Sequence, residues 1–305
     1  MNRSTLRRIR NALTVDVEDY FHVSAFEGII DPCSWDDFDS RVEANTRRVL
    51  DLLASHDLSG TFFVLGWVAE RHPELVRRIQ ANGHEVACHG YGHKRIRFQT
   101  PDVFRQDVRR AKNLLEDLTG QPVLGYRAPS YSITRQTQWA LDILIEEGFR
   151  YDSSIFPIVH DLYGMPGSSR HPYRILRRSG EIQEFPLTTL RLSFMGRTLA
   201  VPIAGGGYLR LFPSWFMNWG LNHVNRNEGQ PATLYFHPWE IDPGQPRVHA
   251  SWKSRFRHYH NLDKTEDRLG RLFRHLNFAP MGAVLNELEP LPAIALDATP
   301  GEHSS

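Results

Sequence analysis

The sequence has few features of exported, membrane-spanning or disulfide-rich proteins. Its two cysteines, Cys33 and Cys88, form no CxxC pair, which argues against a disulfide framework. No run of about 20 apolar residues is present, so we expect no membrane-spanning segment. The basic start of the chain, MNRSTLRRIRNALTV, lacks the apolar stretch of a signal peptide. We therefore expect a cytoplasmic protein.

An excess of charge of one sign is also lacking. The chain has 36 basic and 35 acidic residues, a net charge of +1, which argues against nucleic acid as a partner. No glycine-rich phosphate fingerprint follows the first expected strand, which disfavours a dinucleotide-binding fold. The composition does not indicate an oligomeric state.

What is present is a regular alternation of apolar strands and amphipathic helices over the first half of the chain. This order predicts a parallel α/β sheet, and in 305 residues a barrel is favoured over an open sheet. The expected strands are 12–17, 59–66, 84–89, 123–129, 150–154 and 232–237. The expected helices are 39–57, 73–83, 100–120, 134–149 and 262–276.

Residues from about 157 to 230 break this rhythm with proline, glycine, arginine and short β-like runs. We interpret them as a β-rich insertion in one domain that spans residues 11–285. Residues 286–305, rich in proline and alanine, are expected to be a disordered tail.

Polar residues stand at the expected carboxyl ends of five strands. The ends of parallel strands in such a barrel converge on one site. The first strand ends in three acids, and the others end in two histidines, an arginine, an aspartate and a further histidine. In chain order, these residues are Asp16, Glu18, Asp19, His89, His93, Arg127, Asp152 and His237.

The histidines in HEVACHGYGH predict a metal site. His89 and His93 supply two imidazoles, and a carboxylate would complete a set that suits a divalent metal such as zinc. Strand alternation puts Asp16 and Glu18 on one face, with Asp19 just beyond. Either Glu18 or Asp19 is the third ligand, and this choice stays open.

The remaining polar residues can supply a base and an acid. Asp16 is placed to deprotonate a water, and His237 to protonate a leaving amine, as amide hydrolysis requires. Arg127 would keep Asp16 ionised, and Asp152 would orient His237. Three aromatic residues near these strand ends either stack on a sugar ring or belong to the core: Tyr91, Tyr131 and Trp239.

Five motifs resemble the polysaccharide deacetylase family, also called the NodB homology family or carbohydrate esterase family 4. They are LTVDVED, HGYGH, GYRAPSY, YDSS and YFHPWE. The later part, with GGGYLRLFP and RHYHNLDKT, is similar to a subgroup associated with exosortase-linked exopolysaccharide systems.

This resemblance implies a distorted (β/α)7-type barrel that removes N-acetyl groups from a polysaccharide or its lipid-linked precursor. It implies a divalent metal, zinc first, with cobalt or nickel as alternatives, on His89 and His93. By the same resemblance Asp16 is the base, Arg127 tunes it, His237 is the acid and Asp152 tunes the acid.

The first motif departs from the family pattern. Many members have two adjacent aspartates, whereas Val17 follows Asp16 here. A D-x-D spacing occurs in allantoinase-like relatives and favours Glu18 as the ligand. An allantoinase-like amidohydrolase and a catalytically silent glycan-binding protein are therefore the alternatives to a deacetylase.

Overall fold

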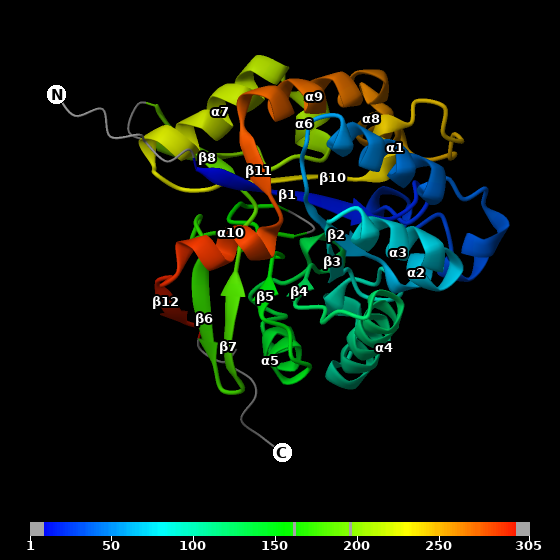
Figure 1. Ribbon diagram of the computed structural model, residues 1–305, viewed down its shortest axis with the longest axis horizontal. Coiled ribbons are helices and arrows are strands. Elements are labelled where there is room, and N and C mark those ends of the chain that lie inside the picture. Colours follow the sequence, from blue (N-terminus) through cyan, green and yellow to red (C-terminus); the bar gives the residue numbers. More distant parts are fainter. Residues whose placement is uncertain (1–8, 161–162, 195–196, 297–305) are drawn as a thin grey trace.

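The computed structural model describes residues 9–160, 163–194 and 197–296. Its centre is a sheet with the strand order β10-β1-β2-β3-β4-β5-β7-β6-β12. Within the described residues, the seven strands from β10 to β7 run parallel, and helices surround them (Figure 1). In sheet order they are β10 (Thr233–Phe236), β1 (Arg10–Val17), β2 (Thr61–Val64), β3 (Glu85–Cys88), β4 (Gly125–Tyr126), β5 (Tyr151–Asp152) and β7 (Gly180–Glu184).

The helices form where apolar residues recur at helical spacing between capping signals. Helix α4 begins after Thr100, whose hydroxyl accepts a hydrogen bond from the N–H of Val103, and it ends at Gly120 with φ of +64°. Its buried residues lie three or four positions apart. The α-helices of the described residues are α1 (Val42–Ala54), α2 (Gly66–Arg71), α3 (Pro73–Ala81), α4 (Pro101–Thr119), α5 (Trp139–Glu146), α6 (Gly207–Leu211), α7 (Ser214–Asn227), α8 (Trp252–Tyr259), α9 (Thr265–His275) and α10 (Met281–Leu288).

Side-chain alternation along β1 separates an outer core from the inside of the curved sheet. Leu13, Val15 and Val17 pack outward into the main core beneath the helices. Ala12 belongs to a second, smaller cluster with residues of neighbouring strands, and Asp16 lies on the same inward face. The inside is therefore apolar at the amino ends of the strands and polar at their carboxyl ends.

Helix α10 closes the amino-terminal end of this interior. The N–H groups of Met281 and Gly282 donate to Thr61 Oγ1 and Glu85 Oε2, and Met281 is fully buried. The chain then continues into strand β12 (Ala293–Ala295), which pairs with β6. The expectation of a disordered tail from residue 286 is therefore wrong for residues 286–296, and residues 297–305 lie outside the described residues.

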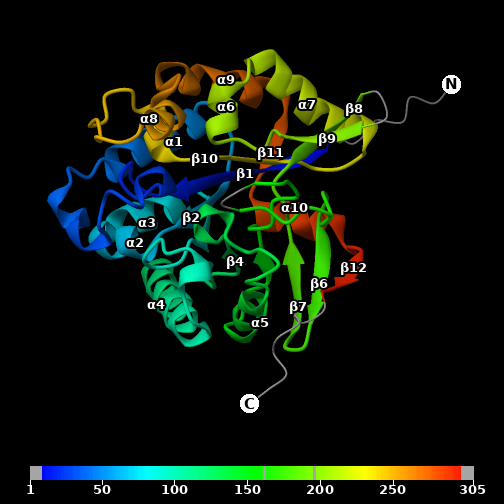
Figure 2. The same cartoon turned by 180° about the vertical axis from the view of Figure 1, so that it is seen from behind.

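The expected insertion is partly a continuation of the sheet. Strand β6 (Tyr173–Arg177) forms a hairpin with β7, and β7 pairs in parallel with β5. Strands β8 (Thr189–Phe194) and β9 (Arg197–Pro202) form a separate two-stranded sheet. After β9 the chain runs beside β10, where the N–H of Tyr235 donates to the carbonyl of Ala204. Figure 2 shows β8 and β9 beside α7, at the upper right.

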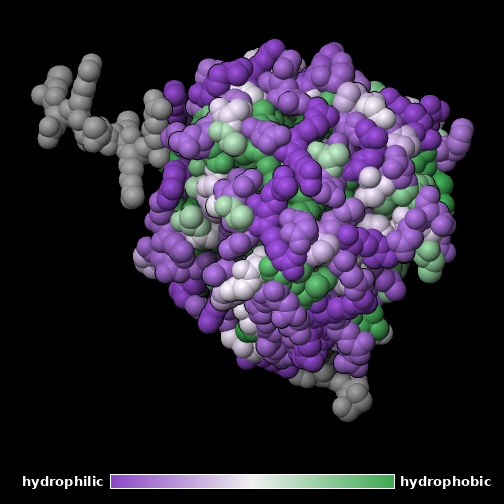
Figure 3. Space-filling model, turned by 45° about the vertical axis from the view of Figure 1, so that its right-hand side comes forward, coloured by the Kyte–Doolittle hydropathy of each residue, from purple (hydrophilic) through white to green (hydrophobic). Residues whose placement is uncertain are grey.

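The remaining elements are short and connect the larger ones. None of the helices in the described part of the chain combines the length and apolarity needed to cross a bilayer. The surface in Figure 3 is mostly hydrophilic, with small scattered hydrophobic patches. The short connecting elements are β11 (Asn277–Ala279), which pairs with β1, and the 3-10 turns η1 (Ser24–Phe26), η2 (Pro32–Asp37), η3 (Ile96–Phe98), η4 (Pro129–Tyr131), η5 (Pro238–Ile241) and η6 (Leu262–Lys264).

Candidate active site

Two histidines and one carboxylate meet at the carboxyl end of the parallel strands. One atom each from Glu18, His89 and His93 lies within 4.8 Å of the others. The Glu18 Oε2 atom is 2.7 Å from His93 Nε2 and 4.0 Å from His89 Nε2. This oxygen is buried and accepts no hydrogen bond from the described residues. A buried, unbonded carboxylate oxygen that faces two imidazoles fits a divalent cation such as zinc.

The orientation of His89 suits a ligand. Its Nδ1 donates to the backbone carbonyl of Arg127 over 2.8 Å, which leaves the lone pair of Nε2 facing Glu18. Burial lowers the pKa of His89 to about 4, so the ring is neutral at pH 7. A neutral imidazole is the form that binds metals.

The loop between the two histidines is held by a carboxylate from α4. Gly90 has φ of +75° and His93 has φ of +48°, so the chain turns sharply between β3 and the second ligand. Asp107 accepts hydrogen bonds from the N–H groups of Tyr91, over 2.8 Å, and Gly92, over 3.1 Å. Asp107 therefore fixes the turn that places His93.

The other oxygen of Glu18 is also fixed. The indole N–H of Trp239 donates to Glu18 Oε1 over 3.3 Å. Burial acts to raise the pKa of Glu18, but the nearby charges of His93 and His237 hold it well below its usual value. Glu18 is therefore ionised, with Oε2 directed at the two histidines.

Asp19, the other candidate for the third ligand, faces helix α1 instead. Its Oδ2 accepts hydrogen bonds from the hydroxyl of Ser40, over 2.9 Å, and from the N–H groups of Arg41 and Val42, over 2.7 and 3.0 Å. These N–H groups have no partner within the helix, so the carboxylate caps α1 from a distant part of the sequence. Asp19 does not join the Glu18 cluster.

Asp16 lies beside this cluster and is held by a buried arginine. Arg127 Nη1 donates to Asp16 Oδ1 over 2.6 Å and to the Thr14 hydroxyl over 2.8 Å. Arg127 also bonds the carbonyl and hydroxyl of Ser153 and is fully buried. The hydroxyl of Tyr131 donates to Asp16 Oδ2 over 3.3 Å. The fixed guanidinium therefore sets the orientation of the Asp16 carboxylate.

His237 faces both carboxylates from the end of β10. Its Nε2 is 3.5 Å from Glu18 Oε1 and 3.9 Å from Asp16 Oδ2. Its Nδ1 is 2.7 Å from Glu240 Oε1, and Arg210 Nε donates to the other oxygen of Glu240 over 2.6 Å. Burial acts to lower the pKa of His237, but these carboxylates raise it to about 9. His237 is therefore a protonated, oriented imidazole at pH 7.

Asp152 lies elsewhere, so the expectation that it orients His237 is wrong. The carboxyl group of Asp152 bonds the hydroxyl and N–H of Ser154 and the carboxyl group of Glu184, which lies opposite it on β7. Both carboxyl groups are fully buried, and burial raises the pKa of each, so the pair holds a proton. The orienting carboxylate of His237 is Glu240.

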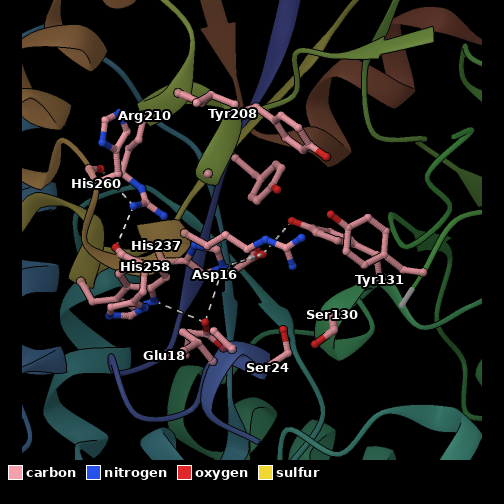
Figure 4. Close-up of a pocket in the computed structure, with 18 of the residues that line it drawn as sticks. Asp16, Glu18, Ser24, Ser130, Tyr131, Tyr208, Arg210, His237, His258 and His260 are labelled. Carbon is pink, nitrogen blue, oxygen red and sulfur yellow. Dashed lines mark hydrogen bonds and ion pairs between the residues drawn. The ribbon is translucent and has the colours of Figure 1, made fainter. Parts of the chain in front are cut away.

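One cavity of about 390 Å³ has a floor formed by Asp16, Glu18, His89, His93 and His237. Figure 4 shows Asp16, Glu18 and His237 close together, with Tyr131 and Ser130 to one side and Arg210 above His237. Tyr91 is not among the cavity-lining residues, and its hydroxyl donates to Glu70. Part of the wall above the floor is formed by Tyr131, Tyr163, Tyr208, Tyr235, Phe256 and Arg257. The arrangement places a donor set that fits a cation beside a carboxylate and an imidazole, and such a combination can support metal-assisted hydrolysis.

Family models agree with this chemistry. Residues 32–149 match the polysaccharide deacetylase family. This segment is named the deacetylase half of the chain. The resemblance seen in the sequence motifs is thus confirmed. Residues 153–286 match a domain of unknown function, DUF3473.

Curated relatives of the deacetylase half have informative names. The chain is 32% identical over 113 residues to a peptidoglycan deacetylase of Helicobacter pylori, a match that covers 37% of this chain and 38% of that protein. It is 33% identical over 98 residues to a peptidoglycan-N-acetylglucosamine deacetylase of Bacillus cereus, covering 32% and 36%. The chain thus spans less than half the length of either relative.

A solved structure extends the similarity to the whole fold. A crystal structure described as a polysaccharide deacetylase from Mycobacterium smegmatis superposes with a TM-score of 0.65 and 21% identity, covering 98% of this chain and 96% of that one. The expected NodB-like α/β fold is therefore confirmed, with both halves included.

The two halves contribute different parts of the site. The deacetylase half supplies His89, His93 and Arg127, whereas the DUF3473 half supplies His237 and its partners. Sequence reasoning missed two of those partners, Glu240 and Arg210. Glu240 follows His237 by three residues in HPWE, a spacing that a 3-10 turn brings together. Nothing local in GGGYLRLFP marks Arg210.

Proposed function

We propose that this protein is a metal-dependent polysaccharide N-deacetylase. The observation that carries the proposal is one cavity with the Glu18, His89 and His93 donor set beside Asp16 and the oriented His237. Because the site draws on both halves of the chain, we also propose that residues 11–285 act as one functional domain.

Glu18, His89 and His93 would hold the divalent cation, zinc first, with cobalt or nickel as alternatives. When bound, such a cation polarises the carbonyl of an amide and lowers the pKa of water. The protein supplies the rest of the chemistry, namely a fixed base, a proton donor and a cavity that holds the acetamide between them.

Asp16 is the base in this proposal. Arg127 and Tyr131 occupy one side of its carboxylate, and Oδ2 also faces the cavity. Asp16 accepts the proton of the attacking water at this oxygen. The fixed guanidinium of Arg127 prevents the carboxylate from turning away during the reaction.

His237 is the acid. Glu240 takes the Nδ1 hydrogen bond, so Nε2 carries its proton into the cavity. His237 passes that proton to the nitrogen of the departing sugar amine. Arg210 keeps Glu240 ionised, because the burial of that carboxylate would otherwise favour its neutral form, and the pKa of Glu240 is lowered to about 2.

The substrate is an N-acetylated glycan, a class named in the curated relatives, which include chitooligosaccharide deacetylases as well. We further propose that it is a polysaccharide of exopolysaccharide biosynthesis or its lipid-linked precursor. The similarity of GGGYLRLFP and RHYHNLDKT to the exosortase-associated subgroup supports this finer assignment.

The spacing of Asp16 and Glu18 supports a second candidate function. The third ligand position falls on Glu18, two residues after Asp16, which is the spacing of allantoinase-like amidohydrolases. Such an enzyme would open a small cyclic amide in the same cavity. It would need the same cation, base and acid, so only the substrate separates the two readings.

The test is metal analysis coupled to acetate release from a panel of N-acetylated oligosaccharides, with allantoin as the competing substrate. We expect about one zinc or cobalt per chain and acetate from the oligosaccharides. His89→Ala should lose the metal and the activity. Turnover of allantoin without acetate release would favour the second function. Glycan binding without any turnover would indicate a silent binding protein, and full activity of His89→Ala would disprove the mechanism.

A further inference from the structure

Helix α8 forms one wall of the cavity mouth and presents two stripes of side chains. Trp252 and Phe256 are 73% and 50% exposed, and they lie four residues apart on one face of the helix. Lys253 and Arg257, also exposed and four residues apart, form the adjacent stripe. His258, on the opposite side, is buried. The helix therefore offers an aromatic stripe next to a basic one.

These stripes lead directly into the cavity. Phe256 and Arg257 belong to its lining, together with Tyr163, and the charge of Arg257 acts on the phenol of Tyr163. A glycan whose acetylated unit lies on the catalytic floor must leave the cavity past this mouth. The side chains of α8 are therefore placed to contact sugar units next to the reacting one.

The basic stripe has no acidic partner among the residues that the structure describes. Residues 243–262 contain four lysines and arginines and no aspartate or glutamate. Neither Lys253 nor Arg257 forms an ion pair with any described residue. Arginines on α4, by contrast, are paired, as Arg105 is with Glu146. An unpaired basic stripe beside a substrate path attracts anionic groups.

On the floor of the cavity, by contrast, the basic groups are paired with carboxylates. Arg127 pairs with Asp16, and His237 faces Glu18 and Glu240. The basic groups of α8 are therefore more accessible to an added carboxylate than those on the floor. This pattern favours acidic groups on the sugar units that neighbour the reacting one.

We propose, on the basis of the deacetylase function above, that α8 selects an acidic polysaccharide. Carboxylate groups on sugar units next to the acetylated one pair with Arg257 and Lys253, while the rings of those units pack on Phe256 and Trp252. Guanidinium and ammonium groups bind carboxylates by charge-assisted hydrogen bonds, and aromatic rings bury the apolar face of a sugar. This assigns part of the DUF3473 half to substrate recognition.

The experiment compares two N-acetylated oligosaccharides of equal length, one neutral and one with alternating uronic acid units. Acetate release should be faster, in kcat/KM, for the acidic one, and added salt should reduce that advantage. Lys253→Gln/Arg257→Gln should lower kcat/KM for the acidic substrate, through KM, about fivefold to tenfold more than it does for the neutral one. The matched control is Arg271→Gln/Arg274→Gln, which removes two exposed charges from α9 and should change neither.

Direct binding of the acidic oligosaccharide, measured by calorimetry, tests the same inference without turnover. Weaker binding by the α8 variant alone supports it, even if neither substrate releases acetate and the deacetylase function fails. Equal use of both substrates by the wild-type protein overturns it, as does an equal loss on both in the α8 variant. Binding to anionic lipid vesicles that depends on Lys253 and Arg257, without discrimination between the oligosaccharides, would assign the stripe to a membrane instead.

Discussion

Three carboxylates at the end of β1 have three different environments. Asp16 pairs with Arg127, Glu18 faces His89 and His93, and Asp19 accepts the N–H groups that begin α1. Strand alternation correctly puts the first two on one face. It cannot separate Glu18 from Asp19, because the chain leaves the strand at this point.

Separate substitutions of Glu18 and Asp19 test the proposal that Glu18, rather than Asp19, is the third ligand. Glu18→Gln should weaken zinc binding at least tenfold to a hundredfold, with little change in stability. Asp19→Asn should bind zinc normally but unfold about 1–2 kcal/mol more easily, because both oxygens of Asp19 accept hydrogen bonds and the amide nitrogen of Asn cannot. Chelator competition and urea unfolding measure the two effects. Zinc loss in Asp19→Asn but not in Glu18→Gln would reverse the assignment.

The contact between Glu240 and His237, the proposed acid, can also be tested. Glu240→Gln should lower kcat by about 10–100-fold, because His237 loses the carboxylate that fixes its proton. The pKa that the pH profile reports for the catalytic acid should also fall, because the carboxylate of Glu240 raises the pKa of His237 in the wild-type protein.

Asp152→Asn is the matched control for this prediction. It alters a buried carboxyl group that contacts Glu184 and Ser154 rather than His237, so its pH profile should resemble that of the wild-type protein. Thermal melting must accompany Glu240→Gln, because Arg210 loses its buried partner. A normal pH profile in Glu240→Gln with a shifted one in Asp152→Asn would return the role to Asp152.

At the scale of elements, the parallel strands and the convergence of their ends could be predicted from the sequence. Apolar runs such as TFFV and TLYF at regular spacing are typical of buried parallel strands. The partners of the strand ends could not be predicted in the same way. Arg210 and Glu240 meet through the packing of α6 against η5, and such contacts between distant segments leave no periodic signal.

Helix α4 holds the loop that carries His93, and the importance of this contact can be tested. Asp107→Ala removes the acceptor of two loop N–H groups, so the second imidazole should lose its fixed position. We expect about 10–100-fold weaker zinc binding although Asp107 is not among the proposed ligands. Asp117→Ala, an exposed acid on the same helix, is the control and should bind zinc normally. Unchanged affinity in Asp107→Ala would show that the loop holds its shape without α4.

At the scale of the whole molecule, the site joins two halves that match different families. The deacetylase half carries two of the proposed ligands and Arg127. The DUF3473 half carries the proposed acid, its orienting pair and the wall of α8. The similarity of the whole fold to a solved deacetylase structure covers both halves. Neither half alone contains a base, a complete ligand set and an acid, so folding of the whole chain is a condition of the proposed activity.

Buried neutral histidines make the stability of this whole fold sensitive to acid. Burial lowers the pKa of His258 to about 3, and of His84 to about 4, below the unfolded value of about 6.5. As the pH falls below about 6.5, the unfolded chain therefore binds protons that the folded chain does not bind. The stability that comes from the neutral histidines is fully present above this pH and is lost progressively until the pH reaches the folded pKa. His258 alone should contribute about 2 kcal/mol of loss between pH 7 and pH 5.

Urea unfolding at pH 7 and pH 5 checks this expectation, with a chelator present so that metal release adds nothing. His258→Gln should lose about 2 kcal/mol less than the wild-type protein on going to pH 5, because glutamine does not titrate. His249→Gln, which changes an exposed histidine, should lose as much as the wild-type protein. The comparison uses the difference between the two pH values, so a lower starting stability of His258→Gln does not affect it. An equal acid loss in His258→Gln and the wild-type protein would show that His258 is protonated in the folded state.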